Sequence, residues 1–220
     1  MRPPNHHHED HPVDTTTNPV TITFPRACKV HRAAGQTARY AFDQVRLAGG
    51  RLVATDGRML ASVPVYGPDG TTELDPVETA GLDVGLPVDV LRAATKGSAK
   101  RCARVCVNGT AEVDGVCYPT IDDREVGEFP DYSAVLRTTP EPLTPKDRTN
   151  AKHKVRLALN PTLLADLAAA LGASDGVVLT FEREVDGRVS SMLRVEPCDS
   201  CNAPAGTFGV IMPITTEAAR

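Results

Sequence analysis

Apolar and polar positions follow the same order three times along this chain. In each repeat an apolar strand comes first, a Pro starts the following helix, and a Gly ends it. Roughly three helical turns separate the Pro from the Gly, and this asymmetry is typical of helix starts and ends. The predicted strands, each with its Pro and Gly, are Thr21–Phe24 with Pro25 and Gly35, Leu82–Leu86 with Pro87 and Gly97, and Val155–Leu159 with Pro161 and Gly172.

A hairpin with a Gly turn follows each predicted helix. The turn dipeptides are Gly49-Gly50, Asn108-Gly109 and Asp186-Gly187, and such pairs favour the tight turns of β-hairpins. The flanking residues alternate as in half-buried strands. Each unit is therefore predicted to contain a strand, a helix and two or three antiparallel strands. This order gives an α+β protein with its helices on one face of antiparallel sheets.

The third repeat carries the clearest helix and follows a polar, Pro-rich linker. Leu163, Leu164, Leu167 and Leu171 fall on one helical stripe, so we expect them in the core. Linker composition and a polar N-terminus then set the expected boundaries. We expect a disordered tail over residues 1–19 and a complete domain of two units over 20–136. The linker is expected over 137–152, and a half domain of one unit over 153–220.

Composition excludes several classes of protein. The formal charge of −4 gives no bulk attraction to nucleic acid, so any DNA contact needs a local basic patch. The absence of Trp argues against a single-strand binder built on base stacking. No apolar run is long enough for a membrane span, and no apolar signal region starts the chain. Six Cys in 220 residues fit a reducing cytosol better than a disulfide scaffold.

The cysteines are the main candidates for chemistry. Cys198 and Cys201 form a lone CxxC; a zinc site would need a second pair, and a redox site would need a helix start after the motif. Residues 202–206 instead indicate a loop, so a zinc or redox protein is kept only as a third hypothesis. We find no phosphate-binding Gly-rich loop and no nucleophile elbow, and therefore expect no catalytic residue, no cofactor and no enzyme. The remaining candidates, Cys102, Cys106 and Cys117, are expected to be small buried hydrophobes.

Three segments far apart in the chain carry distinctive motifs. Residues 52–61 contain Thr-Asp-Gly-Arg-Met-Leu-Ala, residues 127–132 are Gly-Glu-Phe-Pro-Asp-Tyr, and residues 209–214 are Gly-Val-Ile-Met-Pro-Ile. In this order they resemble the bacterial sliding clamp family, the beta subunit of DNA polymerase III. Arg58 and Met59 stand where that family usually has His and Arg, and Arg137 stands where it usually has Pro.

The resemblance covers residues 20–215 and implies a DNA-clamp fold of three βαβββ units. It includes the family's central domain and the second half of its C-terminal domain, but not its N-terminal domain. In that family two units make a domain and twelve make a closed ring, so four copies of this chain, a homotetramer, would supply one ring.

The resemblance implies a processivity factor that encircles double-stranded DNA and tethers a replicative polymerase, with a clamp loader as a further partner. The alternative is a clamp-derived adaptor or decoy that binds clamp-interacting peptides without DNA and never closes into a ring. Either protein would be cytoplasmic, in a bacterial cell or a phage-infected bacterial cell.

A hydrophobic pocket for peptide motifs of partner proteins is also implied. Aliphatic and Met side chains suit such a pocket because they form an adaptable apolar surface. The simpler alternative is that residues 212–214 only form an edge strand packed on its sheet. The residues implied for the pocket are Phe42, Thr55, Gly57, Arg58, Leu60, Leu136, Val210, Met212, Pro213 and Ile214.

Helices of the family line the central hole and meet phosphates without contacting bases. A basic stripe on the first two predicted helices would attract a duplex in a salt-dependent way; an ordinary solvated face explains it equally well. The third helix carries only Asp166, and residues 155–220 contain five basic and eight acidic side chains, so DNA contact would depend on the first two units. The candidates are Arg26, Lys29 and Arg32 within about a third of the first helix's circumference, and Arg92, Lys96 and Lys100 on or just beyond the second.

Overall fold

The computed structural model describes residues 19–35, 43–74, 82–121, 129–132, 135, 159–181 and 192–212. The predicted linker over residues 137–152 and nearly all of the predicted tail lie outside these ranges. So do the Asp186-Gly187 turn and most of the predicted strand Val155–Leu159.

The order of elements repeats as the sequence predicts, and the α+β architecture is confirmed. Unit one contains β1 (Val20–Pro25), the 3-10 helix η1 (Val30–Ala33), β2 (Gln44–Ala48), β3 (Arg51–Thr55) and β4 (Met59–Pro64). Unit two contains β5 (Val84–Pro87), α1 (Val88–Ala94), β6 (Cys102–Val107), β7 (Thr110–Val113) and β8 (Val116–Pro119). The described part of unit three contains α4 (Pro161–Leu171), β9 (Val177–Thr180), β10 (Leu193–Pro197) and β11 (Phe208–Ile211).

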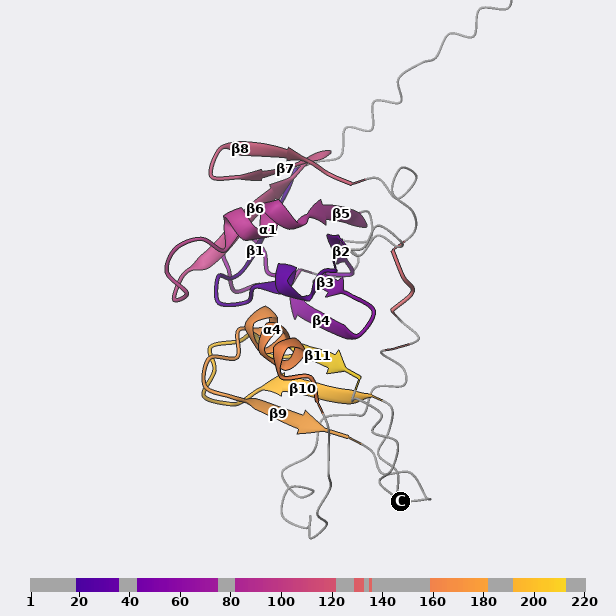
Figure 1. Ribbon diagram of the computed structural model, residues 1–220. Coiled ribbons are helices and arrows are strands. Elements are labelled where there is room, and N and C mark those ends of the chain that lie inside the picture. Colours follow the sequence, from indigo (N-terminus) through magenta and orange to yellow (C-terminus); the bar gives the residue numbers. More distant parts are fainter. Residues whose placement is uncertain are drawn as a thin grey trace, which may run out of the picture.

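Two antiparallel sheets connect the units (Figure 1). The four-stranded sheet has the order β1-β6-β7-β8, and the seven-stranded sheet has the order β5-β2-β3-β4-β11-β10-β9. Units one and two exchange their first strands, because β1 pairs with β6 and β5 pairs with β2. Unit three joins through β11, which pairs with β4. Segments far apart in the sequence therefore meet at the β4–β11 ladder.

Helix α4 forms where the sequence predicts it, because both of its ends are set locally. The Asn160 side chain accepts hydrogen bonds from the backbone N–H groups of Thr162 and Leu163, and Pro161 occupies the first turn. Gly172 ends the helix in the left-handed region with φ +71°. Helix α1 is shorter than predicted and ends at Ala94.

The three-turn helix predicted between Pro25 and Gly35 is wrong. Only the four residues of η1 are helical, and the residue before them makes no side-chain cap. The Lys29 N–H, which in an α-helix would donate to the carbonyl of Pro25, donates instead to the carbonyl of Ala169 in α4, and the Pro25 carbonyl accepts from the N–H of Cys28. A tertiary hydrogen bond therefore replaces part of the predicted helix, and Arg26, Lys29 and Arg32 do not share one helix, because only Arg32 lies in η1.

One hydrophobic core contains residues of all three units. η1 packs between α1 and α4 on the same side of the sheets (Figure 1). Leu167 and Leu171 of α4 are fully buried, and Leu163 and Leu164 pack against the same core, as predicted. None of the helices in the described ranges could cross a lipid bilayer.

The prediction that three cysteines of unit two are buried is wrong. Cys102 and Cys117 are exposed and Cys106 is half-buried. In β6 buried residues alternate with more exposed ones, and Cys102 and Cys106 lie on the more exposed face. Cys117 lies in β8, the outer strand of its sheet. Burial was expected from the small, apolar character of Cys, but these positions lie on the more exposed face or the outer strand of the sheet.

Candidate functional site

The turn between β3 and β4 is held rigidly by its own polar side chains. The Thr55 hydroxyl donates to the carbonyl of Met59 (2.7 Å) and accepts from the N–H of Gly57 (3.1 Å). The Asp56 carboxylate accepts from the N–H groups of Arg58 and Met59, both at 2.8 Å. Gly57 has φ +84°, a conformation that side chains disfavour. Asp56 therefore serves the turn, as its neighbour Gly57 predicts.

Strand β11 runs beside this turn. Val210 lies opposite Leu60 in the β4–β11 ladder, and the N–H of Met212 donates to the carbonyl of Arg58 at 3.1 Å. A Cβ atom on Gly209 would lie 2.7 Å from the Leu60 carbonyl oxygen and 2.7 Å from a methyl group of Leu167. Glycine thus allows β4, β11 and α4 to meet closely at this point.

Arg51 ties the two units together at the same junction. Its guanidinium donates to the Ser62 hydroxyl in β4 and to the carbonyl of Gly206 before β11, both at 2.7 Å. It also lies 5.5 Å from the ring centre of Phe208, and Arg194 lies 4.2 Å from the same ring. Such cation–π contacts help to fix the position of β11.

The Phe-Pro-Asp-Tyr segment, residues 129–132, covers one side of this junction. Phe129 is buried against Val53, Leu60 and Val210. The rings of Phe129 and Tyr132 meet edge to face with 6.1 Å between their centres, and burial raises the pKa of the Tyr132 phenol. The segment is therefore packed on the sheet at the point where units one and three join.

A pocket with a volume of about 130 Å³ opens between the turn, β11 and residues 130–132. Small-molecule sites usually measure roughly 300–1,000 Å³, so this pocket suits a few apolar side chains better than a whole cofactor. Met212, which lies on its wall, is 48% exposed. Among the described residues, the lining consists of Thr55, Gly57, Arg58, Met59, Leu60, Pro130, Asp131, Tyr132, Val135, Val210 and Met212.

Every pocket residue implied by the resemblance that the structure describes lies in this lining. These six are Thr55, Gly57, Arg58, Leu60, Val210 and Met212. The other four, Phe42, Leu136, Pro213 and Ile214, lie outside the described residues. Sequence reasoning missed Met59, Pro130, Asp131, Tyr132 and Val135, although the Phe-Pro-Asp-Tyr motif was a signal that could have identified three of them.

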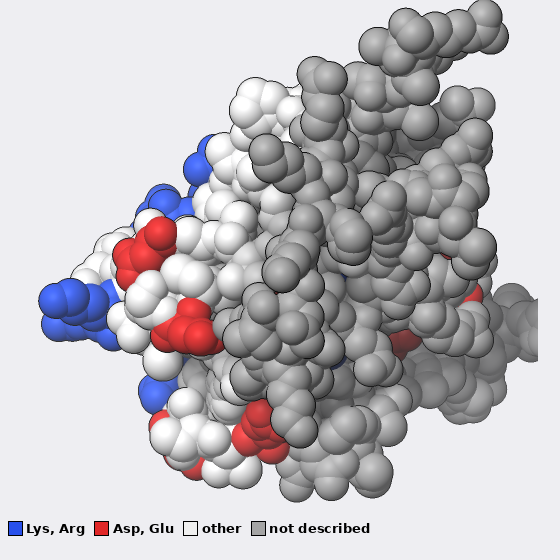
Figure 2. Space-filling view, turned by 90° about the horizontal axis from the view of Figure 1, so that it is seen from below, with Lys and Arg blue, Asp and Glu red and all other residues white. Residues whose placement is uncertain are grey.

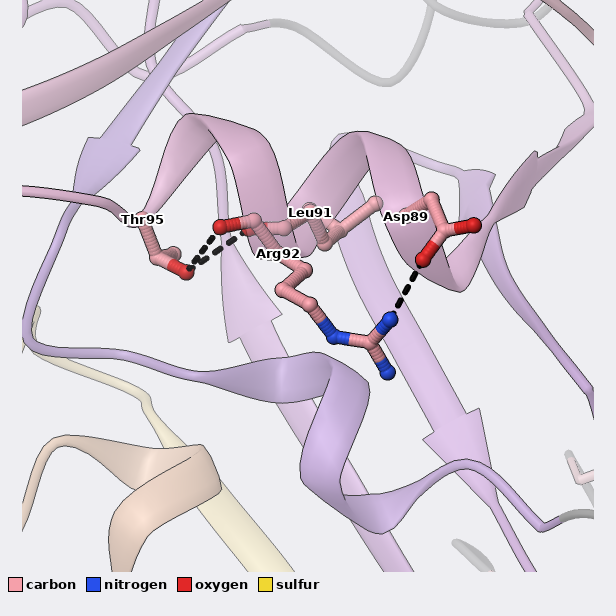
Figure 3. Close-up of polar contacts among 4 residues, drawn as sticks. All are labelled: Asp89, Leu91, Arg92 and Thr95. Atoms are coloured by element: carbon pink, nitrogen blue, oxygen red, sulfur yellow. Dashed lines mark hydrogen bonds and ion pairs between the residues drawn. The ribbon is translucent and has the colours of Figure 1, made fainter.

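The arginines among the predicted DNA contacts already have partners within the protein. Arg32 forms an ion pair with Asp166 of α4 at 2.7 Å, and Arg92 reaches back along α1 to Asp89 (Figure 3). Arg26 donates to two backbone carbonyls, those of Cys102 and Lys96. The exposed side chains of Lys29, Lys96 and Lys100 complete the predicted set.

The structure nevertheless brings part of this set together around His31 in η1. Its pKa is lowered from 6.5 to about 4, first by burial and then by the charges of Arg92, Arg32 and Lys29. Two units thus contribute cations to one surface. Where the face in Figure 2 is formed by described residues, basic and acidic side chains lie side by side.

The CxxC motif lies in the turn after β10, away from the pocket. The sulfur atoms of Cys198 and Cys201 are 3.3 Å apart, and the Sγ of Cys201 also contacts the carbonyl of Gly176 at 3.6 Å. Within the described parts of the chain, no group of three His, Cys, Asp or Glu side chains is arranged to hold a metal ion.

Comparisons with known proteins complete this description. No family model and no curated protein matches the chain. Among solved structures it is similar to a putative DNA polymerase III beta subunit from Eubacterium rectale, with 10% identity over 94% of this chain and 68% of the other, at a TM-score of 0.46. It is also similar to the DNA polymerase III beta subunits of Borrelia burgdorferi (13% identity, 94% and 66%, TM-score 0.45) and Pseudomonas aeruginosa (16% identity, 89% and 66%, TM-score 0.48).

The chain therefore spans about two thirds of the length of these proteins. At such identities and TM-scores the likeness carries no conclusion about activity or partners.

Proposed function

We propose that this chain is a clamp-like processivity factor. Its pocket binds a short peptide of a replicative polymerase or a clamp loader, and assembled copies hold that partner on duplex DNA in a bacterial or phage-infected cell. The observation that carries the proposal is the apolar pocket where the β3–β4 turn of unit one meets β11 of unit three. The sequence motifs that suggest a clamp supply its walls.

The energetics suit a weak and reversible contact. Burying two or three apolar side chains of a peptide contributes about 1.5–3 kcal/mol each. Ordering the peptide and the Met side chain offsets part of this gain, which leaves a dissociation constant in the micromolar to millimolar range. A ring that presents several such pockets would hold a polymerase more tightly than one pocket does.

The number of units supports assembly from several copies. Three units lie in one chain, and twelve form the ring in the family that the motifs resemble. Four chains meet that number, so we propose a homotetrameric ring. Encirclement holds a protein on DNA without strong attraction, which is consistent with the formal charge of −4.

A peptide titration tests the pocket. We expect a fluorescent clamp-binding peptide from a bacterial replicative polymerase to bind the full chain with a dissociation constant in the micromolar to millimolar range. Met212→Asp should weaken binding at least about tenfold, because it removes an apolar contact and places a charge at the wall. Fluorescence anisotropy measures both affinities.

Val116→Asp is a matched control, since Val116 and Met212 are the two exposed large hydrophobic residues in the described ranges. Val116 lies outside the pocket lining, so this variant should bind the peptide like the wild type. Equal binding by Met212→Asp and the wild type, or no binding by the wild type, would contradict a role for the pocket.

A second candidate is a clamp-derived adaptor or decoy that binds such peptides without DNA. The observation in its favour is the pairing of Arg32 with Asp166 and of Arg92 with Asp89. These ion pairs reduce the positive charge available for phosphates. The two candidates share the pocket and differ in one requirement, a closed ring around duplex DNA.

A further inference from the structure

The last strands of the units follow a pairing rule within this molecule. β4 ends unit one, β8 ends unit two and β11 ends unit three. β4 and β11 pair with each other in antiparallel fashion, and every residue of β4 is buried. β8 is the outer strand of the four-stranded sheet and lies at its far end in Figure 1. In the described part of the chain it is the one last strand without such a partner.

The side chains of β8 are more exposed than those of β4 and β11, which pair with each other. Val116 and Tyr118 point to the same face as Ala111 and Val113, which are buried in the neighbouring strand β7. Tyr118 is half-buried against the core, but Val116 is 53% exposed. An apolar side chain on the core-facing side of the sheet is therefore open to solvent at its edge.

Backbone geometry shows which groups of β8 point outward. Asp114 and Gly115 have φ +49° and φ +80°, as in a type I′ turn, so the N–H of Val116 is directed at the Val113 carbonyl of β7. Hydrogen-bonding direction alternates along an antiparallel strand, so the N–H and carbonyl of Cys117 point away from β7. Pro119, two residues on, also faces outward, but it has no N–H group and can offer only its carbonyl oxygen.

We propose that β8 pairs with β8 of a second copy of this chain, antiparallel and about a twofold axis at Cys117. The two Cys117 residues would exchange N–H···O bonds. Val116 of each copy would lie opposite Tyr118 of the other copy. These would be non-hydrogen-bonded pairs, in which the side chains lie closest together, and a β-branched residue opposite an aromatic one is favourable.

A second copy is the occupant because the other last strands are already used. β4 and β11 pair with each other, which leaves β8 to meet its own equivalent, and a twofold contact completes both edges at once. The interface would provide one joint of a ring, but it needs neither DNA nor a peptide. It can therefore exist if the proposed function fails, and the proposed peptide binding can exist without it.

Native mass measurements test the interface. We expect Val116→Lys to halve the mass of the wild-type assembly in sedimentation velocity, because a charged side chain at this position opposes edge pairing. Thr110→Lys adds the same charge to the exposed face of β7, away from the edge, and should keep the wild-type mass. A monomeric wild type, or an unchanged mass for Val116→Lys, would overturn the proposal.

Cross-linking tests the register. A short bis-maleimide should join two chains through Cys117, since the axis passes beside this residue. Cys117→Ser should abolish the covalent dimer, whereas Cys102→Ser, which removes another exposed thiol, should retain it. A dimer that survives Cys117→Ser and disappears in Cys102→Ser would place the contact elsewhere and overturn the proposal.

Discussion

His31 lies among the basic side chains of Lys29, Arg32 and Arg92. Its folded-state pKa of about 4 lies below the ordinary value of 6.5, through burial first and then through Arg92, Arg32 and Lys29. As pH falls through this window the unfolded chain binds a proton that the folded chain does not. The free energy of unfolding therefore decreases from about pH 6.5 downward.

We expect the melting temperature to fall as the pH is lowered from about 6.5 to about 5, a range above the ordinary pKa values of carboxylates. His31→Gln should show a smaller fall, because glutamine stays neutral throughout. Differential scanning fluorimetry across this range measures both slopes. Identical slopes for the two proteins would show that His31 does not bind a proton on unfolding.

Residues whose contacts are close in sequence could be predicted, and those with distant contacts could not. The role of Asp56 in its turn follows from the adjacent Gly57, and the structure confirms it. The ion pair between Arg32 and Asp166 joins two units, and no local pattern indicates it. Helical spacing can suggest a basic stripe, but it does not show which of its arginines pair with an acidic residue of another unit.

At the scale of elements, the same distinction separates α4 from η1. α4 carries its own start and stop signals in Asn160, Pro161 and Gly172, so the sequence predicts it. η1 is limited to four residues because Lys29 donates its N–H to the carbonyl of Ala169 in α4. A competing hydrogen bond from another unit cannot be found from helical spacing.

The contact of α4 with the β4–β11 ladder depends on Gly209. An added methyl group would lie 2.7 Å from the Leu60 carbonyl oxygen and 2.7 Å from Leu167, and overpacking of this kind costs about 1–3 kcal/mol. We expect Gly209→Ala to lower the free energy of unfolding by that amount in urea titrations. It should also weaken peptide binding, because Val210 and Met212 of the pocket follow directly.

Gly67→Ala is the control for this prediction. Gly67 is also buried, but an added methyl group there would meet its nearest neighbour at 3.5 Å, an ordinary contact. Its free energy of unfolding should change by less than about 0.5 kcal/mol. A Gly209→Ala variant as stable as Gly67→Ala would mean that α4 and β11 have room to move apart.

At the scale of the whole molecule, the repeat and the pocket were predictable to different degrees. Three recurring strand–helix–strand patterns predict the units, because the period of each element is local. The pairing of β4 with β11 depends on which edges meet, and only the motif resemblance brought Leu60 and Val210 together before the structure did. Tyr132 belongs to a motif that the sequence analysis singled out, but its place on the pocket wall depends on Phe129, which packs against Leu60 and Val210 in a long-range contact.

A closed ring and an open adaptor differ in their response to DNA topology. The protein is first diluted and then concentrated in the presence of nicked circular plasmid, so that rings can assemble around the DNA. If four chains encircle the DNA, the protein should stay with the plasmid through gel filtration at high salt, where phosphate contacts are screened. Cutting the plasmid once should release the protein, because a ring slides off a free end. Binding by charge alone would instead be lost at high salt from both DNA forms. Equal retention on circular and linear DNA, or none on either, would contradict encirclement, and peptide binding with no retention would favour the adaptor.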